Sequence, residues 1–599
     1  MKMSRLLMVL SVCESLSLQA VATDGAFQAF VSIGDEGTTR VERYSVDKSG
    51  NWTYVDRLTQ EGDGRSGKIM SVEYYQGLVY VTSSERDAPG VGSKINVFTP
   101  EGEFLKEAAT NILLTANDKA TILDCIRISP DGHYAYVSAA FNATWLNRFE
   151  NNQTTANSNK NWCKPNGTCR GMAIDRSGKV YVANRGKGGV YVYDPAVNTE
   201  PHAIYPCKTQ IEGAPEPHAV ALDEDKGYLY VTDKTKTWAV YKIGVTTAPL
   251  ASGIFPATMN ALEMRCVDGI VYAACYGAKS ICRYDFDVPN SKATYTTLVS
   301  FSEPVTGIAL APAITKRTNK LGEVYLTNTT FGRVERFGVD VDGKWTFMNV
   351  VAKMNDGFLP AGTMASSCVR DGLVYVAGYD ANKLTQIHSY TPDGTHVKTH
   401  ATGISSTADH LAISPDSAFV YISNCFAPNA NRVLRYSLLD GTGNAYITDG
   451  VGQPRSLDVD SEGNLYVAAR SANAVKKFAT GETPKLLGWQ TFANASGIAW
   501  CKANRRVFAS DKQEIVKIFD GDLGSELFSE QDATKYGNVL GFACIGTAAY
   551  CVSYEYRPIQ ALKPDGTSWS TTSLFYLPYV VLTASAAETV PKGLSVIVR

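Results

Sequence analysis

Hydrophobic and polar residues alternate along most of the chain with the short period that is typical of β-strands. One pattern recurs: an apolar strand, a turn that often contains glycine, and a second strand centred on tyrosine. It is found in "GLVYVT" at 77, "GKVYVAN" at 178, "GYLYVTD" at 227, "GIVYAAC" at 269, "GEVYLTN" at 322, "GLVYVAG" at 372, "AFVYISN" at 418, "GNLYVAA" at 463 and "RRVFASD" at 505. With weaker copies at 133 and 547, the spacing runs from 42 to 56 residues, which is the period of a four-stranded blade.

A single four-stranded blade cannot bury both of its faces, so blades of this kind stack radially into a propeller. The fuller phrases "RGMAIDRSGKVYVANR" (170–185), "PHAVALDEDKGYLYVTD" (217–233) and "PRSLDVDSEGNLYVAAR" (454–470) resemble the NHL-repeat and SMP-30/gluconolactonase-like six-bladed β-propellers. The resemblance covers most of the chain and implies an all-β fold. It implies little about activity, because the phrases encode strand, turn and strand, and the family includes pure binding scaffolds.

The chain is also duplicated. "TTRVERYSVDKSGNWTYVD" at 38–56 returns as "FGRVERFGVDVDGKWTFMN" at 331–349, and shifts of 278 to 295 residues superpose the other units in order. We therefore predict two tandem six-bladed β-propellers, with a single larger ring as the alternative. The expected divisions are a first propeller at 23–312, a linker at 313–322 and a second propeller at 323–599.

Each half should close its ring by pairing a late inner strand with its first strands. The segment 304–312 is expected to join the strands of 27–59, and 578–586 those of 323–355. Trp52 and Trp345, which belong to the duplicated phrase, are then expected to pack between neighbouring blades.

The first residues have the features of a secretory signal. Lys2 and Arg5 precede the apolar run 6–12, and "AVA" at 20–22 has the small-x-small form of a cleavage site, so we expect residues 1–22 to be removed and the protein to be secreted. No later apolar run reaches the roughly 18–20 residues of a membrane span. The net charge of −2, a pI near 6.4 and the lack of a block of like charges argue against a nucleic-acid partner.

Export favours disulfides. Cys163 and Cys169 bracket the turn "KPNGT", and Cys275 and Cys282 flank "YGAKSI", so both pairs are disulfide candidates. Because no Cys-x-x-Cys pair exists, a structural zinc site is not expected.

Propellers bind ligands at the funnel mouth, where the innermost strand of each blade begins. At this position consecutive blades carry Asp124, Arg170 and His218 in the first half, and Asp409 and Arg455 in the second, where His410 lies one residue further along. Three interpretations stay open: the acid and the guanidinium tie adjacent blades together, the set binds an anionic sugar or carboxylate, or His218 acts as a base oriented by Asp124.

The resemblance to SMP-30-like enzymes implies a divalent metal, such as calcium, held at the funnel by Glu, Asn and Asp. Glu263 and Asn260 lie near the funnel, but the family's ligand set cannot be matched residue by residue. Elsewhere, the Asn-rich segment 145–168 is an insertion whose tryptophans could stack on sugars, and His396 and His400 are expected to face solvent.

These observations favour a secreted, non-catalytic binding or scaffold protein that recognises a carbohydrate polymer or an extracellular protein through its funnels. The alternative is an enzyme of the first funnel. It would be either a metal-dependent lactonase or hydrolase, or a lyase on uronic-acid polysaccharides that uses His218, Arg170 and Asp124.

Overall fold

The computed structural model describes most of the chain between residues 25 and 588. The described ranges are 25–34, 38–63, 67–84, 93–112, 123–132, 134–139, 146–150, 161–163, 168–195, 203–206, 216–312, 320–329, 331–340, 344–425, 430–511, 513–531, 539–553, 560–562, 568–570 and 581–588. The expected signal peptide, 1–22, lies outside them.

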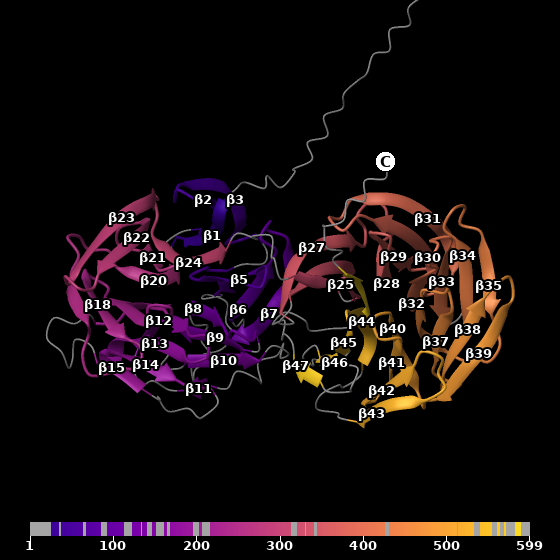
Figure 1. Ribbon diagram of the computed structural model, residues 1–599. Coiled ribbons are helices and arrows are strands. Elements are labelled where there is room, and N and C mark those ends of the chain that lie inside the picture. The colour runs from indigo at the N-terminus through magenta and orange to yellow at the C-terminus, as the bar shows by residue number, and fades with distance from the viewer. Residues whose placement is uncertain are drawn as a thin grey trace, which may run out of the picture.

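Within these ranges the chain forms twelve four-stranded antiparallel sheets, which confirms the all-β propeller class (Figure 1). The strands of the first half are β1 (Gly25–Ile33), β2 (Arg40–Asp47), β3 (Trp52–Gln60), β4 (Val72–Tyr75), β5 (Leu78–Ser83), β6 (Ser93–Phe98), β7 (Phe104–Ile112), β8 (Leu123–Ile128), β9 (Tyr134–Ala139), β10 (Leu146–Glu150), β11 (Asn161–Cys163), β12 (Cys169–Ile174), β13 (Val180–Asn184), β14 (Gly189–Tyr193), β15 (Ala203–Pro206), β16 (Ala219–Asp223), β17 (Tyr228–Thr232), β18 (Thr237–Lys242), β19 (Ala251–Ile254), β20 (Ala261–Val267), β21 (Ile270–Cys275), β22 (Ser280–Asp287), β23 (Lys292–Ser300) and β24 (Val305–Pro312).

The strands of the second half are β25 (Lys320–Asn328), β26 (Arg333–Asp340), β27 (Trp345–Lys353), β28 (Gly362–Arg370), β29 (Leu373–Asp380), β30 (Leu384–Tyr390), β31 (His396–Ser405), β32 (His410–Ile413), β33 (Phe419–Asn424), β34 (Arg432–Ser437), β35 (Gly443–Ile447), β36 (Pro454–Val459), β37 (Leu465–Ala469), β38 (Ala474–Thr480), β39 (Pro484–Thr491), β40 (Ala495–Cys501), β41 (Arg506–Asp511), β42 (Ile515–Asp520), β43 (Glu526–Gln531), β44 (Val539–Ile545), β45 (Ala548–Ser553), β46 (Gln560–Leu562), β47 (Ser568–Ser570) and β48 (Val581–Glu588). No described helix is long and apolar enough to cross a membrane.

Burial changes with radial position in a sheet. The tyrosine-centred second strands β5, β13 and β37 are buried at every residue, because neighbouring blades cover both of their faces. The outermost strand β39 is exposed at most positions. Alternation of side chains between two packed faces therefore explains why the repeat is apolar around its tyrosine.

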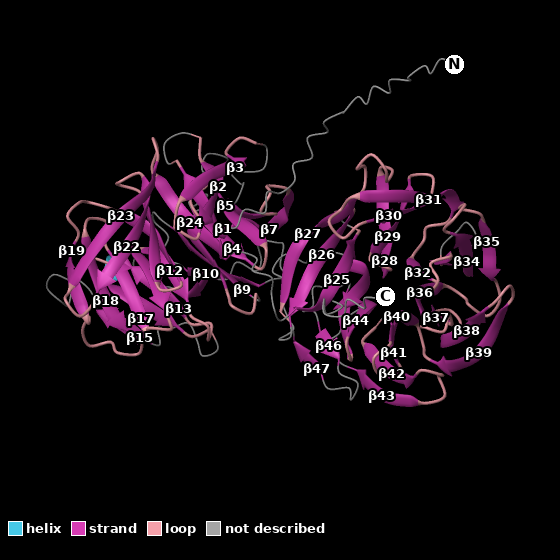
Figure 2. Ribbon diagram, turned by 45° about the horizontal axis from the view of Figure 1, so that its top comes forward, coloured by secondary structure: helices cyan, strands magenta, loops and turns pink. Residues whose placement is uncertain are grey.

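The innermost strands contact one another in two closed circles, and Figure 2 looks into the second of them. The first ring contains β4, β8, β12, β16, β20 and β24, and the second ring contains β28, β32, β36, β40, β44 and β48. In each ring the last strand completes the sheet of the first strands. β24 pairs with β1, and β48 pairs with β25, as expected from the sequence. The domain divisions at 312 and 323 stay a prediction, and β25 already begins at Lys320.

The tryptophans of the duplicated phrase lie between blades, which confirms that expectation. The Trp52 ring centroid is 6.2 Å from that of Tyr272 in the neighbouring blade. Trp345 is fully buried, and its centroid is 5.8 Å from that of Tyr550.

The two rings are in direct contact. One hydrophobic cluster contains Leu78 and Leu105 of the first ring's blade β4–β7 together with Trp345 and Phe347 of the second ring. The Phe347 amide donates a hydrogen bond to the Gln76 carbonyl over 2.8 Å. The two rings therefore share one hydrophobic cluster at this contact.

Candidate functional site

The funnel-mouth residues of the first ring are tied to each other. Arg170 on β12 donates from Nη1 to the Asp124 carboxylate on β8 over 2.5 Å, and both side chains are mostly buried. This contact joins two adjacent blades. The ion pair occupies the Arg170 guanidinium, which is the group that an anionic ligand would otherwise bind.

The corresponding pair in the second ring is looser. The Arg455 Nη1 atom is 3.5 Å from the Asp409 carboxylate and 2.9 Å from the Cys425 sulfur. Asp409 also accepts a hydrogen bond from the Cys425 amide over 3.0 Å. The structure thus brings each acid and guanidinium of the sequence prediction together, and their role in ligand binding stays a prediction.

The two funnel histidines are buried within the blades. His218 Nδ1 donates to the Ala261 carbonyl over 3.1 Å, and no hydrogen bond joins it to Asp124 in the described part of the chain. Burial, with a contribution from the Arg170 charge, lowers the pKa of His218 to about 3. In this structure Asp124 pairs with Arg170 rather than with His218, and a catalytic role for the three residues stays a prediction. His410 accepts a long hydrogen bond from the Leu457 amide at 3.4 Å, and burial lowers its pKa to about 4.

Glu263, considered above as a metal ligand only because of the resemblance to SMP-30-like enzymes, is sequestered at the centre of the first ring. It forms ion pairs with Arg127 and, at 3.4 Å, with Arg265, and it accepts the Ile308 amide over 2.8 Å. Two guanidinium groups at the carboxylate would repel a cation. Among the described residues no three His, Cys, Asp or Glu side chains are arranged to hold a metal. These residues do not fit a lactonase-type metal centre, and the calcium expectation stays untested.

A cavity of about 460 Å³ opens at the opposite end of the first ring, where the inner strands finish. Among the described residues that line it, carboxylates outnumber guanidiniums by five to three: Glu73, Asp223, Glu224, Asp225 and Asp268 against Arg127, Arg176 and Arg265. Its lining is therefore predominantly acidic.

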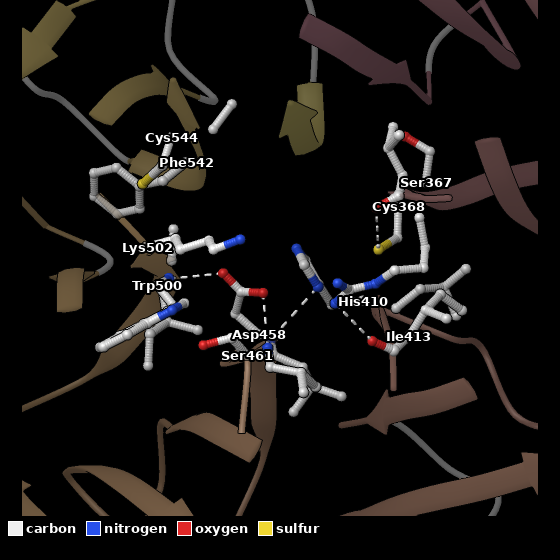
Figure 3. Close-up of a pocket in the computed structure, with 18 of the residues that line it drawn as sticks. Ser367, Cys368, His410, Ile413, Asp458, Ser461, Trp500, Lys502, Phe542 and Cys544 are labelled. Carbon is white, nitrogen blue, oxygen red and sulfur yellow. Dashed lines mark hydrogen bonds between the residues drawn. The ribbon is translucent and has the colours of Figure 1, made fainter. Parts of the chain in front are cut away.

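The second ring has a cavity of about 260 Å³ at the same end of its inner strands. Its described charged lining consists of Arg370, Lys502 and Asp458, with the neutral His410 deeper inside. Figure 3 shows the Lys502 side chain extending towards the Asp458 carboxylate. Trp500 contributes an aromatic wall and stacks on Tyr466 with ring centroids 5.5 Å apart.

Asp458 is held in the second-ring cavity by backbone. It accepts hydrogen bonds from the amides of Val459 and Trp500, each over 2.7 Å. Desolvation nevertheless raises the pKa of Asp458 to about 6. Arg370 on β28 donates to the Ile413 carbonyl over 3.1 Å, and its Nε atom has no hydrogen-bond partner among the described residues. The cavity is therefore lined by a carboxyl group that titrates near neutrality and by the guanidinium of Arg370, whose Nε atom is itself buried.

Four charged residues of these cavities share a position that the sequence reasoning missed, and they are Glu73, Arg127, Arg265 and Asp458. They lie on the inner strand opposite the repeat's tyrosine, three or four residues beyond the funnel-mouth position. In the first ring the pairs are Glu73 with Tyr80, Arg127 with Tyr136, Ala173 with Tyr181 and Arg265 with Tyr272. In the second they are Cys368 with Tyr375, Ala412 with Tyr421, Asp458 with Tyr466 and Ala543 with Tyr550. The tyrosine of each repeat marks this position in the sequence. The two centres differ at the positions named here, whereas the fourth blade of each ring carries alanine there, as Ala221 and Ala499.

The disulfide prediction for Cys275 and Cys282 is wrong in this structure, where both are free thiols. Cys275 lies opposite Ser280, and Cys282 lies opposite Ala273, so the cysteines are diagonal neighbours. Diagonal positions across a sheet are farther apart than a disulfide requires. The Cys163 side chain lies outside the described residues, so its pairing with Cys169 stays a prediction. Trp162 of the insertion is buried against Tyr136 and Tyr193, so it cannot stack on a sugar.

No protein-family model matches the chain, and no curated protein matches its sequence. One similar solved structure is titled "Crystal structure of Nidogen/Laminin Complex". A chain in it is 13% identical to this one, with a TM-score of 0.36 over 44% of this chain and 98% of that chain. At this identity and score the likeness carries no argument about function.

Proposed function

We propose that the protein is an exported binding protein that holds an acidic residue of a carbohydrate polymer in the second-ring cavity. The observation that carries this proposal is the convergence of Arg370 and Lys502 on one small cavity with an aromatic wall. Among its described lining residues, two cations face a single carboxylate, Asp458. An anion is therefore the ligand that this charge balance favours.

The chemistry of the lining suits an acidic sugar. A guanidinium binds a carboxylate through parallel N–H donors, and Arg370 is the guanidinium that lines this cavity. Asp458 would accept hydrogen bonds from sugar hydroxyls, and Trp500 offers an apolar surface for a pyranose ring. Such a mixture of apolar walls and a few polar groups is typical of small-ligand pockets.

The two rings do not favour binding the same ligand twice. The first-ring cavity is predominantly acidic, whereas the second-ring cavity carries an excess of positive charge. We therefore expect one acidic-ligand site per chain rather than the bivalent binding that the duplication alone would suggest.

Isothermal titration calorimetry with oligogalacturonate and with uncharged oligogalactose of equal length tests the proposal. We expect binding of the acidic oligomer only, and at least about tenfold weaker binding by Arg370→Gln, because a charged hydrogen bond contributes about 1.5–3 kcal/mol. Arg283→Gln is the matched control, since Arg283 is exposed on β22 and pairs with Asp285 away from both cavities. Equal affinity of wild type and Arg370→Gln, or no binding of the acidic oligomer, would refute the proposal and leave a protein partner as the alternative.

A second candidate function rests on Asp458. A carboxyl group with a pKa of about 6 in a ligand cavity suits general acid–base catalysis at neutral pH. If the cavity is catalytic, Asp458→Asn should abolish turnover of an acidic polysaccharide while the oligomer still binds. Unchanged polymer length after prolonged incubation with wild type would remove this candidate and leave the binding proposal intact.

A further inference from the structure

Three of the seven histidines of the chain gather in one hairpin of the second ring, formed by β30 and β31. They are His388 on β30, and His396 and His400 on β31. The expectation that His396 and His400 face solvent holds only in part. Both are only half exposed, and both form hydrogen bonds with β30. None of the three histidines lines either cavity, so this cluster is separate from the sites described above.

Two of these imidazoles face each other through ring nitrogens. His388 Nδ1 is 3.2 Å from His396 Nε2, and the Thr399 hydroxyl oxygen is 3.1 Å from the former and 3.5 Å from the latter. On its other side, His388 Nε2 donates to the Gln386 side-chain carbonyl over 3.1 Å. That contact assigns the proton of His388 to Nε2 and leaves Nδ1 with a lone pair directed at His396.

The surroundings hold this pair in position. His388 is fully buried, and the His396 ring stacks on Phe358 with centroids 3.7 Å apart. Tyr390 packs edge-on against His396 and donates to the Asp356 carboxylate over 3.0 Å. Thr399, whose hydroxyl oxygen contacts both nitrogens, is exposed.

We propose that His388 and His396 form a binding site for a divalent transition ion, with Zn²⁺ as the ion to test. Two nitrogens that each lie about 2.05 Å from a tetrahedral zinc are about 3.3 Å apart, which matches the spacing of these imidazoles. A ligating histidine usually donates its second nitrogen to an outer acceptor, as His388 does to Gln386. No third His, Cys, Asp or Glu completes the group in the described chain, so Thr399 and water fill the remaining positions.

Calorimetric titration of the full-length protein with Zn²⁺ at pH 7.5 tests the site, with Mg²⁺ as the ion that imidazoles do not prefer. We expect saturable Zn²⁺ binding that His396→Gln weakens at least about tenfold. His400→Gln is the matched control and should bind like wild type. His400 lies on the same strand and is also partly buried, but its nitrogens contact the Leu438 carbonyl at 2.7 Å and the Ser389 hydroxyl at 3.0 Å.

Electron paramagnetic resonance of the Cu²⁺-loaded protein provides a second measurement. Couplings to two imidazole nitrogens in wild type and to one in His396→Gln support the site. Absence of Zn²⁺ binding in wild type, equal affinity in His396→Gln, or equal loss in His400→Gln would each overturn it. If wild type binds no Zn²⁺, the imidazoles of His388 and His396 share only an N–H···N hydrogen bond. Thermal unfolding of each metal-free variant verifies that a loss of affinity does not reflect a loss of fold.

Discussion

Replacement of Glu263 by glutamine should destabilise the first ring strongly, because it leaves a buried arginine without its principal partner. The side chains of Glu263 and Arg127 are 2% and 4% exposed, so solvent screens their ion pair very little. After the substitution, the nearest carboxylate to Arg127 is Glu73, with the charged atoms 3.8 Å apart. Removal of one partner from a buried pair costs about 3–5 kcal/mol. For a unit of this size that lowers the melting temperature by on the order of 10 °C.

Differential scanning calorimetry at pH 7.5 measures this loss of stability, and two further variants serve as comparisons. Glu526→Gln removes one partner of the surface pair with Lys517, whose charged atoms are 2.5 Å apart, and should cost less than about 1 kcal/mol. The double variant Glu263→Leu/Arg127→Met should be more stable than Glu263→Gln, because it removes both buried charges and leaves Arg265 paired with Glu73 at 3.0 Å. A loss below about 1 kcal/mol in the single variant, or a double variant less stable than the single one, would refute the reasoning.

Three further predictions concern other parts of the two rings. Because the pKa of His218 is about 3 in the folded protein and about 6.5 when unfolded, the unfolded chain takes up the proton first as the pH falls, so stability is lost from about pH 6.5 downwards. Urea denaturation should show that this group lowers the free energy of unfolding by about 2 kcal/mol between pH 7.5 and 5.0. The difference in free energy of unfolding between wild type and His218→Gln should shrink by the same amount. If the free energies of both proteins change in parallel with pH, the prediction is contradicted. Gly77→Ala should lower the melting temperature far more than Gly357→Ala. Both glycines have positive φ, but only at Gly77 would the new Cβ lie 2.2 Å from the Phe347 carbonyl oxygen, and equal effects would argue against close ring contact. Finally, mass spectrometry after denaturation and alkylation without reductant should find Cys275 alkylated, and a peptide disulfide-linked through it would contradict the free thiol.

The architecture could be predicted from the sequence because the tyrosine-centred repeat marks a strand that is buried on both faces. A strand buried on both faces must be apolar at successive positions, as Leu78–Ser83 is, and the turn before it recurs at blade spacing. The closing strands β24 and β48 were also predictable. In a closed ring each sheet needs an innermost strand, and for the sheets of β1 and β25 only a late strand of the same half is left to supply it.

The site was less accessible to sequence reasoning, for geometric reasons. Asp124 and Arg170 were correctly paired from their positions in consecutive blades. The polar centre lies further along the strands, and which inner-strand residue faces the axis depends on bulges such as the one between Ala261 and Glu263. The contact of His388 with His396 depends on three register shifts between β30 and β31, and no periodicity in the sequence reveals them.

The late position of the closing strands has a consequence for synthesis on the ribosome. The first ring has all its strands once residue 312 has emerged, so its seam between β24 and β1 can form while the rest of the chain is still being translated. The second ring must wait for β48, and until then β25 presents an unpaired edge. Unpaired edges invite aggregation. The finished first ring offers nascent β27 a surface to pack on through Phe347, so the opposite edge of the same sheet already has a partner while β25 waits for β48.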